Sequence, residues 1–182
     1  MIGRVRRLAG LVPAYARIAW WGLVGPRLES EPLLVVQAAV LGPQGILLSM
    51  RSDLWGWELP GGNPQPGEAP DAALRREVRE ETGLDVELEK PVGDYVRTGF
   101  RPHRARVYRC RAVGGALAPS EETPRVAWFP TEALPDTLFA WYRAPIEDAL
   151  ARQSEPVERH DHQGLSTILD AARIDLRTRW RG

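Results

Sequence analysis

The spacing of apolar positions changes several times along the chain, and each change predicts a new element. The run LLVVQAAVL at 33–41 is almost continuously apolar and has the length of a strand. The turn GPQG and the segment GILLSMR at 45–51 follow it, so the two runs predict a strand pair. Further strands are expected in 85–100 and 103–115, around a loop, and a short one in 124–130. Strands mixed with helices predict one α/β or α+β unit.

Helical patterns follow the strand pair in three places. Pro70 to Thr82 contains helix formers throughout, with Pro70 suited to the first helical position and Gly83 to the C-terminal stop. Two further helices are expected around 139–152 and 166–177. The segment SEPVERHDHQG between them is polar, so we expect an exposed linker in which His160 and His162 face solvent.

The first residues predict an amphipathic helix. Apolar side chains recur there at helical spacing, flanked by arginines, at Leu8, Leu11, Val12, Tyr15 and Ile18. Pro13 interrupts the stretch that imitates a secretory signal, and no apolar run reaches the roughly 20 residues that a membrane span needs. The favoured interpretation is that this helix packs on its own domain or on the partner in a homodimer. Contact of residues 1–28 with a membrane surface is the alternative.

Composition and charge narrow the classes of function. The 182 residues carry 24 basic and 24 acidic side chains, whereas a general nucleic-acid binder would normally be more basic. Cys110 is the single cysteine, which excludes an intramolecular disulfide and a multi-cysteine zinc site. We therefore expect a cytoplasmic protein with one main domain at 32–152, an N-terminal helical extension at 1–31 and a helical C-terminal extension at 153–182.

Three glutamates on the predicted helix at 70–82 form the strongest candidate for chemistry. Glu77, Glu80 and Glu81 stand at i, i+3 and i+4, so their carboxylates point to one side of the helix. Like charges at this spacing repel each other unless something positive lies between them. Because Mg²⁺ prefers carboxylate oxygens, the cluster indicates a divalent-cation site.

The spacing of residues around these glutamates resembles the box motif of the Nudix hydrolase family at every specified position. The match runs over 23 residues, with seven fixed residues: Gly62, Glu68, Arg76, Glu77, Glu80, Glu81 and Gly83. The flanking segments WELPGG and ETPRVAWFP also look like the family, so the resemblance extends over roughly residues 32 to 150. It implies an α/β/α sandwich around a mixed β-sheet, to which this chain adds the N-terminal helix and the C-terminal helices.

The resemblance also implies an activity and the residues that carry it. Members of the family cleave a nucleoside diphosphate linked to another moiety, by attack of water on a phosphorus of the pyrophosphate. Glu77, Glu80 and Glu81 would bind Mg²⁺ or Mn²⁺ together with the carbonyl of Gly62. Glu77 or Glu80 would accept the proton of the water. Arg76 would support them by pairing with Glu80 or reaching back to Glu68.

Outside the box, several residues are candidates for the site. Glu122 stands six residues before Trp128, where many relatives carry a further acidic metal ligand or base, and its neighbour Glu121 is a rival. Arginine forks suit phosphate oxygens and aromatic rings can stack on a base. The candidates for substrate binding are Arg51, Trp55, Phe100, Arg101 and His103.

The expected function is therefore metal-dependent hydrolysis of a small-molecule nucleotide. Nucleotide sugars, ADP-ribose, dinucleoside polyphosphates and nucleoside triphosphates all remain open, since loops outside the box decide among them. The alternative is a catalytically silent protein of the same fold that binds nucleotides or regulates a partner. The complete glutamate cluster argues against it, because a pure binding module has no need of a metal cluster.

Overall fold

A computed structural model describes residues 15–16, 20, 33–151 and 153–181 of the chain. Its elements after residue 32 are β1 (Leu33–Gly42), β2 (Gly45–Met50), β3 (Trp57–Glu58), β4 (Gly61–Gly62), α3 (Pro70–Thr82), β5 (Leu84–Gly99), β6 (His103–Gly115), β7 (Arg125–Phe129), a 3₁₀ turn at Ala140–Tyr142, α4 (Arg143–Ala151), β8 (Val157–Gln163) and α5 (Leu165–Arg181). The helix at 70–82 and the strands predicted before and after it are confirmed.

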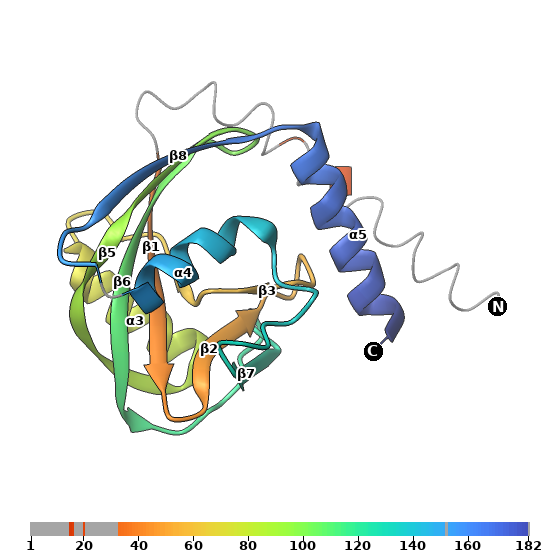
Figure 1. Cartoon of the computed structure of the whole chain (residues 1–182). Helices are drawn as coiled ribbons and strands as arrows, with labels where there is room; N and C mark the ends of the chain where they lie inside the picture. Colours follow the sequence, from red (N-terminus) through yellow and green to blue (C-terminus); the bar gives the residue numbers. More distant parts are fainter. Residues whose placement is uncertain (1–14, 17–19, 21–32, 152, 182) are drawn as a thin grey trace.

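The strands form one mixed sheet, as expected (Figure 1). Its order is β3-β2-β1-β6-β5-β8, with β4 paired to β1 and β7 paired to β2. β1 runs parallel to β6 and antiparallel to β2, while β5 and β6 form a long antiparallel pair. The central position of β1 explains its nearly continuous apolar run, because both of its faces are covered.

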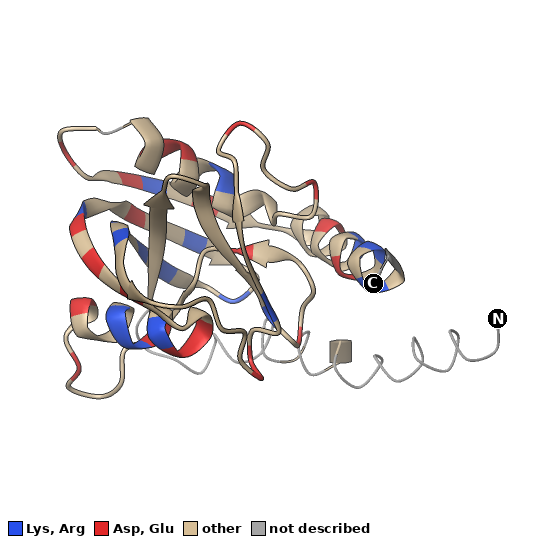
Figure 2. Ribbon diagram, turned by 90° about the horizontal axis from the view of Figure 1, so that it is seen from below, with Lys and Arg blue, Asp and Glu red and all other residues tan. Residues whose placement is uncertain are grey.

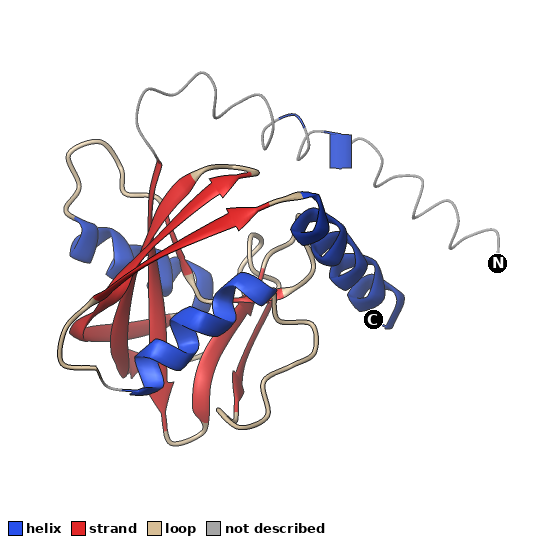
Figure 3. Ribbon diagram, turned by 45° about the horizontal axis from the view of Figure 1, so that its top comes forward, coloured by secondary structure: helices blue, strands red, loops and turns tan. Residues whose placement is uncertain are grey.

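Two apolar clusters lie on opposite faces of this sheet. Successive side chains of a strand point to opposite faces, so Val36, Ala38 and Val40 join the cluster that contains Val78 of α3. Ala39 points the other way, into the cluster that contains residues of α4. Figure 3 shows the sheet between these two helices. The predicted sandwich of helix, sheet and helix is confirmed.

The expected linker between the last two helices is in fact a strand, so that prediction was wrong. Residues Val157–Gln163 form β8, which pairs in parallel with β5 at the edge of the sheet. Its side chains are mostly exposed, and His160 and His162 do face solvent as expected. This segment is a strand because its backbone hydrogen-bonds to β5. Its side chains are polar and show no alternation of apolar and polar positions, so the sequence did not indicate a strand. β8 then leads directly into α5.

The expectations for residues 1–31 fall almost entirely outside the described residues. Tyr15, Ala16 and Trp20 are described and are helical. Across the described parts of the chain, no helix combines the length and the apolar character needed to cross a bilayer.

Candidate active site

Helix α3 carries the glutamates, and its ends and buried face fix how they point. Gly83 ends the helix in the left-handed conformation, with φ of 75°, and its N–H donates to the carbonyl of Arg79. Leu74 and Val78 are fully buried against the sheet. These two residues hold one face of the helix in the core. The neighbouring glutamates therefore lie where the helix passes from the core to solvent. Both signs of charge are visible on α3 in Figure 2.

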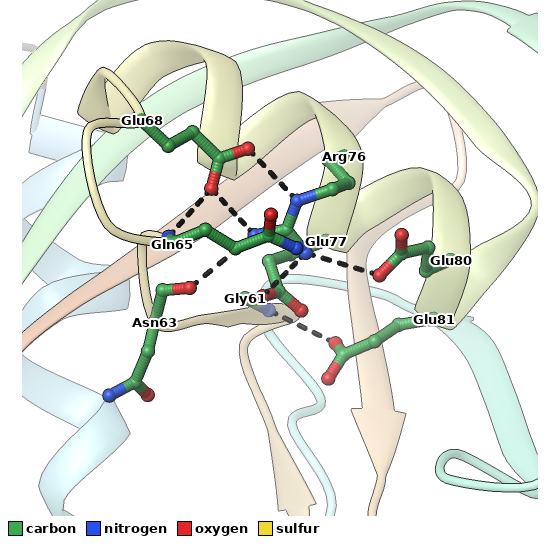
Figure 4. Close-up of polar contacts among 8 residues, drawn as sticks. All are labelled: Gly61, Asn63, Gln65, Glu68, Arg76, Glu77, Glu80 and Glu81. Atoms are coloured by element: carbon green, nitrogen blue, oxygen red, sulfur yellow. Dashed lines mark hydrogen bonds and ion pairs between the residues drawn. The ribbon is translucent and has the colours of Figure 1, made fainter.

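Arg76 is the centre of the polar contacts on α3 (Figure 4). Its guanidinium donates to both carboxylate oxygens of Glu68, at 2.9 and 2.8 Å, and to Glu77 at 2.9 Å. It also reaches Glu80 at 3.2 Å, and Glu68 accepts the backbone N–H of Gln65 at 2.8 Å. Both pairings predicted for Arg76 are therefore present. The loop before the helix and two of the three glutamates share this single cation.

Glu81 occupies a different environment, on the buried side of the cluster. Its side chain accepts the backbone N–H of Gly61 at 3.0 Å, and the residue is 8% exposed. Burial, together with the negative charges of Glu58 and Glu77, raises the pKa of Glu81 to about 8, against the hydrogen bond from Gly61. Among the described contacts Glu81 forms no ion pair, and the charge of Arg51 opposes the rise of its pKa only in part.

Gly62 allows the loop to approach the helix closely. A Cβ atom at this position would lie 2.4 Å from Cδ of Glu77, so any side chain would displace the glutamate. Since Gly62 is also paired with Val36 of β1, the loop cannot simply move away. The carboxyl of Glu77 is consequently held against the backbone of Gly62.

These residues fit a divalent cation by the chemistry of their donors. Glu77 lies against Gly62 and Glu81 against Gly61, so two carboxylates border the same short stretch of backbone and supply hard oxygen atoms. Within the described ranges, no three His, Cys, Asp or Glu side chains already converge on one point. Arg76 instead engages Glu77 and Glu80. We therefore expect a bound cation to compete with Arg76 for these carboxylates.

A cavity of about 540 Å³ opens beside the cluster, within the usual range for small-molecule sites. Gly61, Gly62 and Asn63 contribute to its wall. Four of the five candidates for substrate binding also line it, namely Arg51, Phe100, Arg101 and His103. The cavity thus adjoins the box, and its wall combines residues that precede the box in the sequence with residues that follow it.

Trp55 is the exception, because it is not among the residues that line the cavity. The guanidinium groups of Arg125 and Arg179 lie over its ring, at 5.1 and 4.8 Å from the ring centroid. Its backbone N–H donates to Asp175 of α5 at 2.6 Å. In this structure Trp55 connects the loop before the box to the C-terminal helix.

Buried Arg97 and half-buried His103 form a pair at the cavity wall. His103 Nδ1 lies 2.7 Å from the carbonyl of Arg101, which can only accept, so Nδ1 carries the proton. Nε2 then accepts from Arg97 at 3.0 Å. Burial lowers the pKa of His103 to about 4, and the charge of Arg97 lowers it further. The imidazole is therefore neutral and fixed in one tautomer.

Sequence reasoning missed several residues of the cavity. Gln37, Glu58 and Tyr142 line it and are joined by hydrogen bonds. Burial raises the pKa of Glu58 to about 7, although Arg51 and Tyr142 oppose this shift. Glu58 lies in the segment WELPGG, which was noted only as a whole for its resemblance to the family, whereas an isolated glutamine in an apolar strand gives no signal. Helix α5 adds Thr167 and Ile168, far from the box in sequence.

Glu122 lies in an exposed loop near the cluster. Its backbone carbonyl accepts the N–H of Ser52 at 2.8 Å. The next residue, Thr123, donates to the backbone carbonyl of Glu81 at 2.5 Å. The loop is therefore tied to the end of α3, and a role of Glu122 as metal ligand stays a prediction.

Comparison with known proteins agrees with this arrangement. The family model described as the NUDIX domain matches residues 32–150. A "MutT-like protein" of Streptomyces ambofaciens is 36% identical over 139 residues, which cover 75% of this chain and 90% of that protein. The human "8-oxo-dGDP phosphatase NUDT18" is 36% identical over 123 residues, which cover 63% of this chain but 37% of that protein.

A solved structure shows the same fold. The ADP-ribose pyrophosphatase of Streptococcus suis is 28% identical and superimposes with a TM-score of 0.60, covering 72% of this chain and all of that one. The box, the sandwich around a mixed sheet and these matches agree over the same part of the chain. The chain belongs to the Nudix family and is a nucleotide pyrophosphohydrolase.

Proposed function

We propose that this enzyme uses Mg²⁺ or Mn²⁺, held by Glu77, Glu80, Glu81 and the carbonyl of Gly62, to hydrolyse a nucleoside diphosphate linked to another moiety. The observation that carries the proposal is the close approach of Gly62 to Glu77 at the edge of the cavity. The backbone of the loop and the carboxylate of Glu77 meet there, beside a cavity of about 540 Å³. The bound cation would supply charge neutralisation for the pyrophosphate and a lower pKa for the attacking water.

The residues of the chain would divide the remaining tasks. Glu77 or Glu80 accepts the proton of the attacking water, and Glu80 is the more accessible, with 60% of its side chain exposed against 16% for Glu77. Arg76 holds both carboxylates in place until the cation binds. Glu122, on the loop tied to Glu81, serves as a further ligand or base.

Recognition of the nucleotide falls to the cavity residues. Arg51 and Arg101 offer guanidinium groups for phosphate oxygens, and Phe100 offers an aromatic face for a base. Arg51 is already paired in a fork with Asp53, at 2.8 and 2.7 Å, so its direction is fixed before substrate arrives. Trp55, which lies off the cavity, would contribute by positioning the loop.

The names of relatives suggest which substrates to test first. One relative is named for 8-oxo-dGDP and a structural neighbour for ADP-ribose. A panel of 8-oxo-dGTP, 8-oxo-dGDP, dGTP, ADP-ribose and a nucleotide sugar therefore covers both kinds. Nucleotide release is followed by chromatography with Mg²⁺, with Mn²⁺ and with excess EDTA.

The proposal expects turnover that disappears in EDTA and returns when the metal is restored. Glu80→Gln should lose activity at least about 100-fold on every substrate, since the lost interaction belongs to a shared transition state. Glu87→Gln is the matched control, because Glu87 is equally exposed, at 55%, but lies on β5 and pairs with Arg111. Full turnover in excess EDTA, or an unaffected Glu80→Gln variant, would contradict the proposal.

A further inference from the structure

The side-chain amide of Gln37 on β1 has an acceptor that nothing in the described structure uses. Gln37 is 4% exposed, and its Nε2 donates to the hydroxyl of Tyr142 at 3.1 Å. Its Oε1 is buried and, among the described residues, has no hydrogen-bond partner. Burying a carbonyl oxygen without a donor is unfavourable, so such a group calls for an explanation.

The neighbours of Gln37 determine which end of the amide is free. The hydroxyl of Tyr142 lies 3.0 Å from a carboxylate oxygen of Glu58. Above the raised pKa of Glu58, of about 7, its carboxylate is ionised and can only accept, so the Tyr142 proton points to Glu58 and the hydroxyl oxygen accepts from Gln37. The NH₂ group of Gln37 is therefore committed to Tyr142. The unpartnered atom is a carbonyl oxygen, which can accept a hydrogen bond and cannot donate one.

The position of Gln37 distinguishes it from the other unpartnered atom in the described residues. That atom is Oγ of Ser49, which is fully buried and does not line the cavity. Gln37 does line the cavity and pairs with Gly61 across β1 and β4. Gln37 therefore lies beside the residue that precedes the box, at the wall of the cavity in which the proposed function places the nucleotide.

The rest of the cavity suits a flat ring that carries an N–H group. Phe139 and Trp141 line it as a stacked pair, with ring centroids 4.7 Å apart and planes 5° apart. Phe100 and Ile168 add apolar surface. Apolar walls bury the faces of a ring, whereas its edge must find polar partners.

We propose that Gln37 is a specificity-determining residue, whose Oε1 accepts a hydrogen bond from an exocyclic amino group of the substrate's nucleobase. The inference rests on the proposed function, because it places a nucleotide in this cavity. A base without that amino group leaves the buried oxygen unpartnered in the complex as well. Sites built to hydrogen-bond a substrate group reject analogues that lack it.

The test compares substrates that differ by one amino group. The pairs are dGTP with dITP, and dATP with the triphosphate of purine deoxyriboside, assayed at pH 8.5, where Glu58 is ionised. In at least one pair the wild-type enzyme should favour the amino-bearing base by about ten- to 100-fold in kcat/KM. In Gln37→Met, which keeps the length of the side chain but has no strong acceptor, that ratio should fall to within about threefold.

Two controls separate recognition from folding. Ser49→Ala removes the other unpartnered atom away from the cavity and should keep the wild-type ratio. Calorimetry of dGMP against dIMP, and of dAMP against the purine deoxyriboside monophosphate, measures recognition without turnover. Gln37→Met should lose the preference in binding as in catalysis, even if its melting temperature changes.

The remaining outcomes test the role of Gln37 independently of the proposed metal-dependent hydrolysis. Equal kcat/KM within both pairs, or an undiminished ratio in Gln37→Met, would overturn the role of Gln37 while leaving metal-dependent hydrolysis intact. A uniform loss on all substrates would also overturn it, because Gln37 would then act only through Tyr142 and Glu58. If none of the triphosphates is hydrolysed, the monophosphate calorimetry still decides the inference.

Discussion

Asp175 of helix α5 accepts the backbone N–H of Trp55 at 2.6 Å, and this bond joins the C-terminal helix to the loop that precedes the box. The same carboxylate accepts from Arg179 at 2.8 Å and from the hydroxyl of Tyr15. Its side chain is 1% exposed. Through this buried acid, a helix outside the matched family region is joined to the loop before the box, and the same helix contributes residues to the cavity wall.

Asp175→Asn should destabilise the protein, because Arg179 would lose its anion and a buried hydrogen-bond network would lose its common acceptor. We expect a loss of about 1–3 kcal/mol in the free energy of unfolding, measured by urea denaturation. Asp170→Asn is the matched control on the same helix, since its side chain is 60% exposed and pairs with Arg173 at the surface. Equal effects of the two substitutions would show that α5 is not held through Asp175.

Glu81→Gln should abolish hydrolysis without lowering the stability of the metal-free protein. The substitution removes a charge that burial, Glu58 and Glu77 already disfavour, while the amide oxygen can still accept from Gly61. In EDTA, the melting temperature should stay level or rise slightly. A clear fall in melting temperature would mean that the ionised form of Glu81 is structural.

Arg76→Lys should lower kcat about tenfold or more, because an ammonium cannot reproduce the fork to Glu68 while also holding Glu77. The adjacent Arg75→Lys is a close control, since Arg75 pairs only with Asp71 on the outer side of the helix among the contacts described. Steady-state kinetics at saturating Mg²⁺ would compare them. Similar kcat values for the two variants would show that Arg76 does not position the glutamates.

The pair of His103 and Arg97 should make stability depend on pH below neutrality. The folded-state pKa of His103 is about 4, below the roughly 6.5 of an unfolded chain, so the unfolded state binds more protons between these values. The contribution of neutral His103 is present above pH 6.5 and is lost as the pH falls toward 4. Denaturation at pH 8 and pH 5 should show a smaller difference for His103→Gln than for wild type. An identical difference would mean that His103 is accessible to protons in the folded state.

Local patterns of the sequence were sufficient for most of the fold. Helix α3 begins at Pro70 and ends before Gly83, and the buried stripe of Leu74 and Val78 determines which of its faces packs against the sheet. These signals act within one element, so they are readable without knowing what lies opposite. The same holds for β1, whose continuous apolar run indicates burial on both faces. The box residues could be identified for the same reason, since their spacing is a property of one loop and one helix.

What only the tertiary structure decided depends on partners far apart in the chain. β8 is a strand because its backbone pairs with β5 about 60 residues earlier, while its own side chains are polar. Trp55 is turned to Asp175 and Arg179 instead of the cavity, and these residues lie more than 100 positions away. The amide oxygen of Gln37, and not its NH₂ group, is the unpartnered end because the NH₂ group donates to Tyr142. Hydrogen bonds between distant segments leave no periodic trace in a sequence, so the chemistry of the box could be read from it and the shape of the recognition cavity could not.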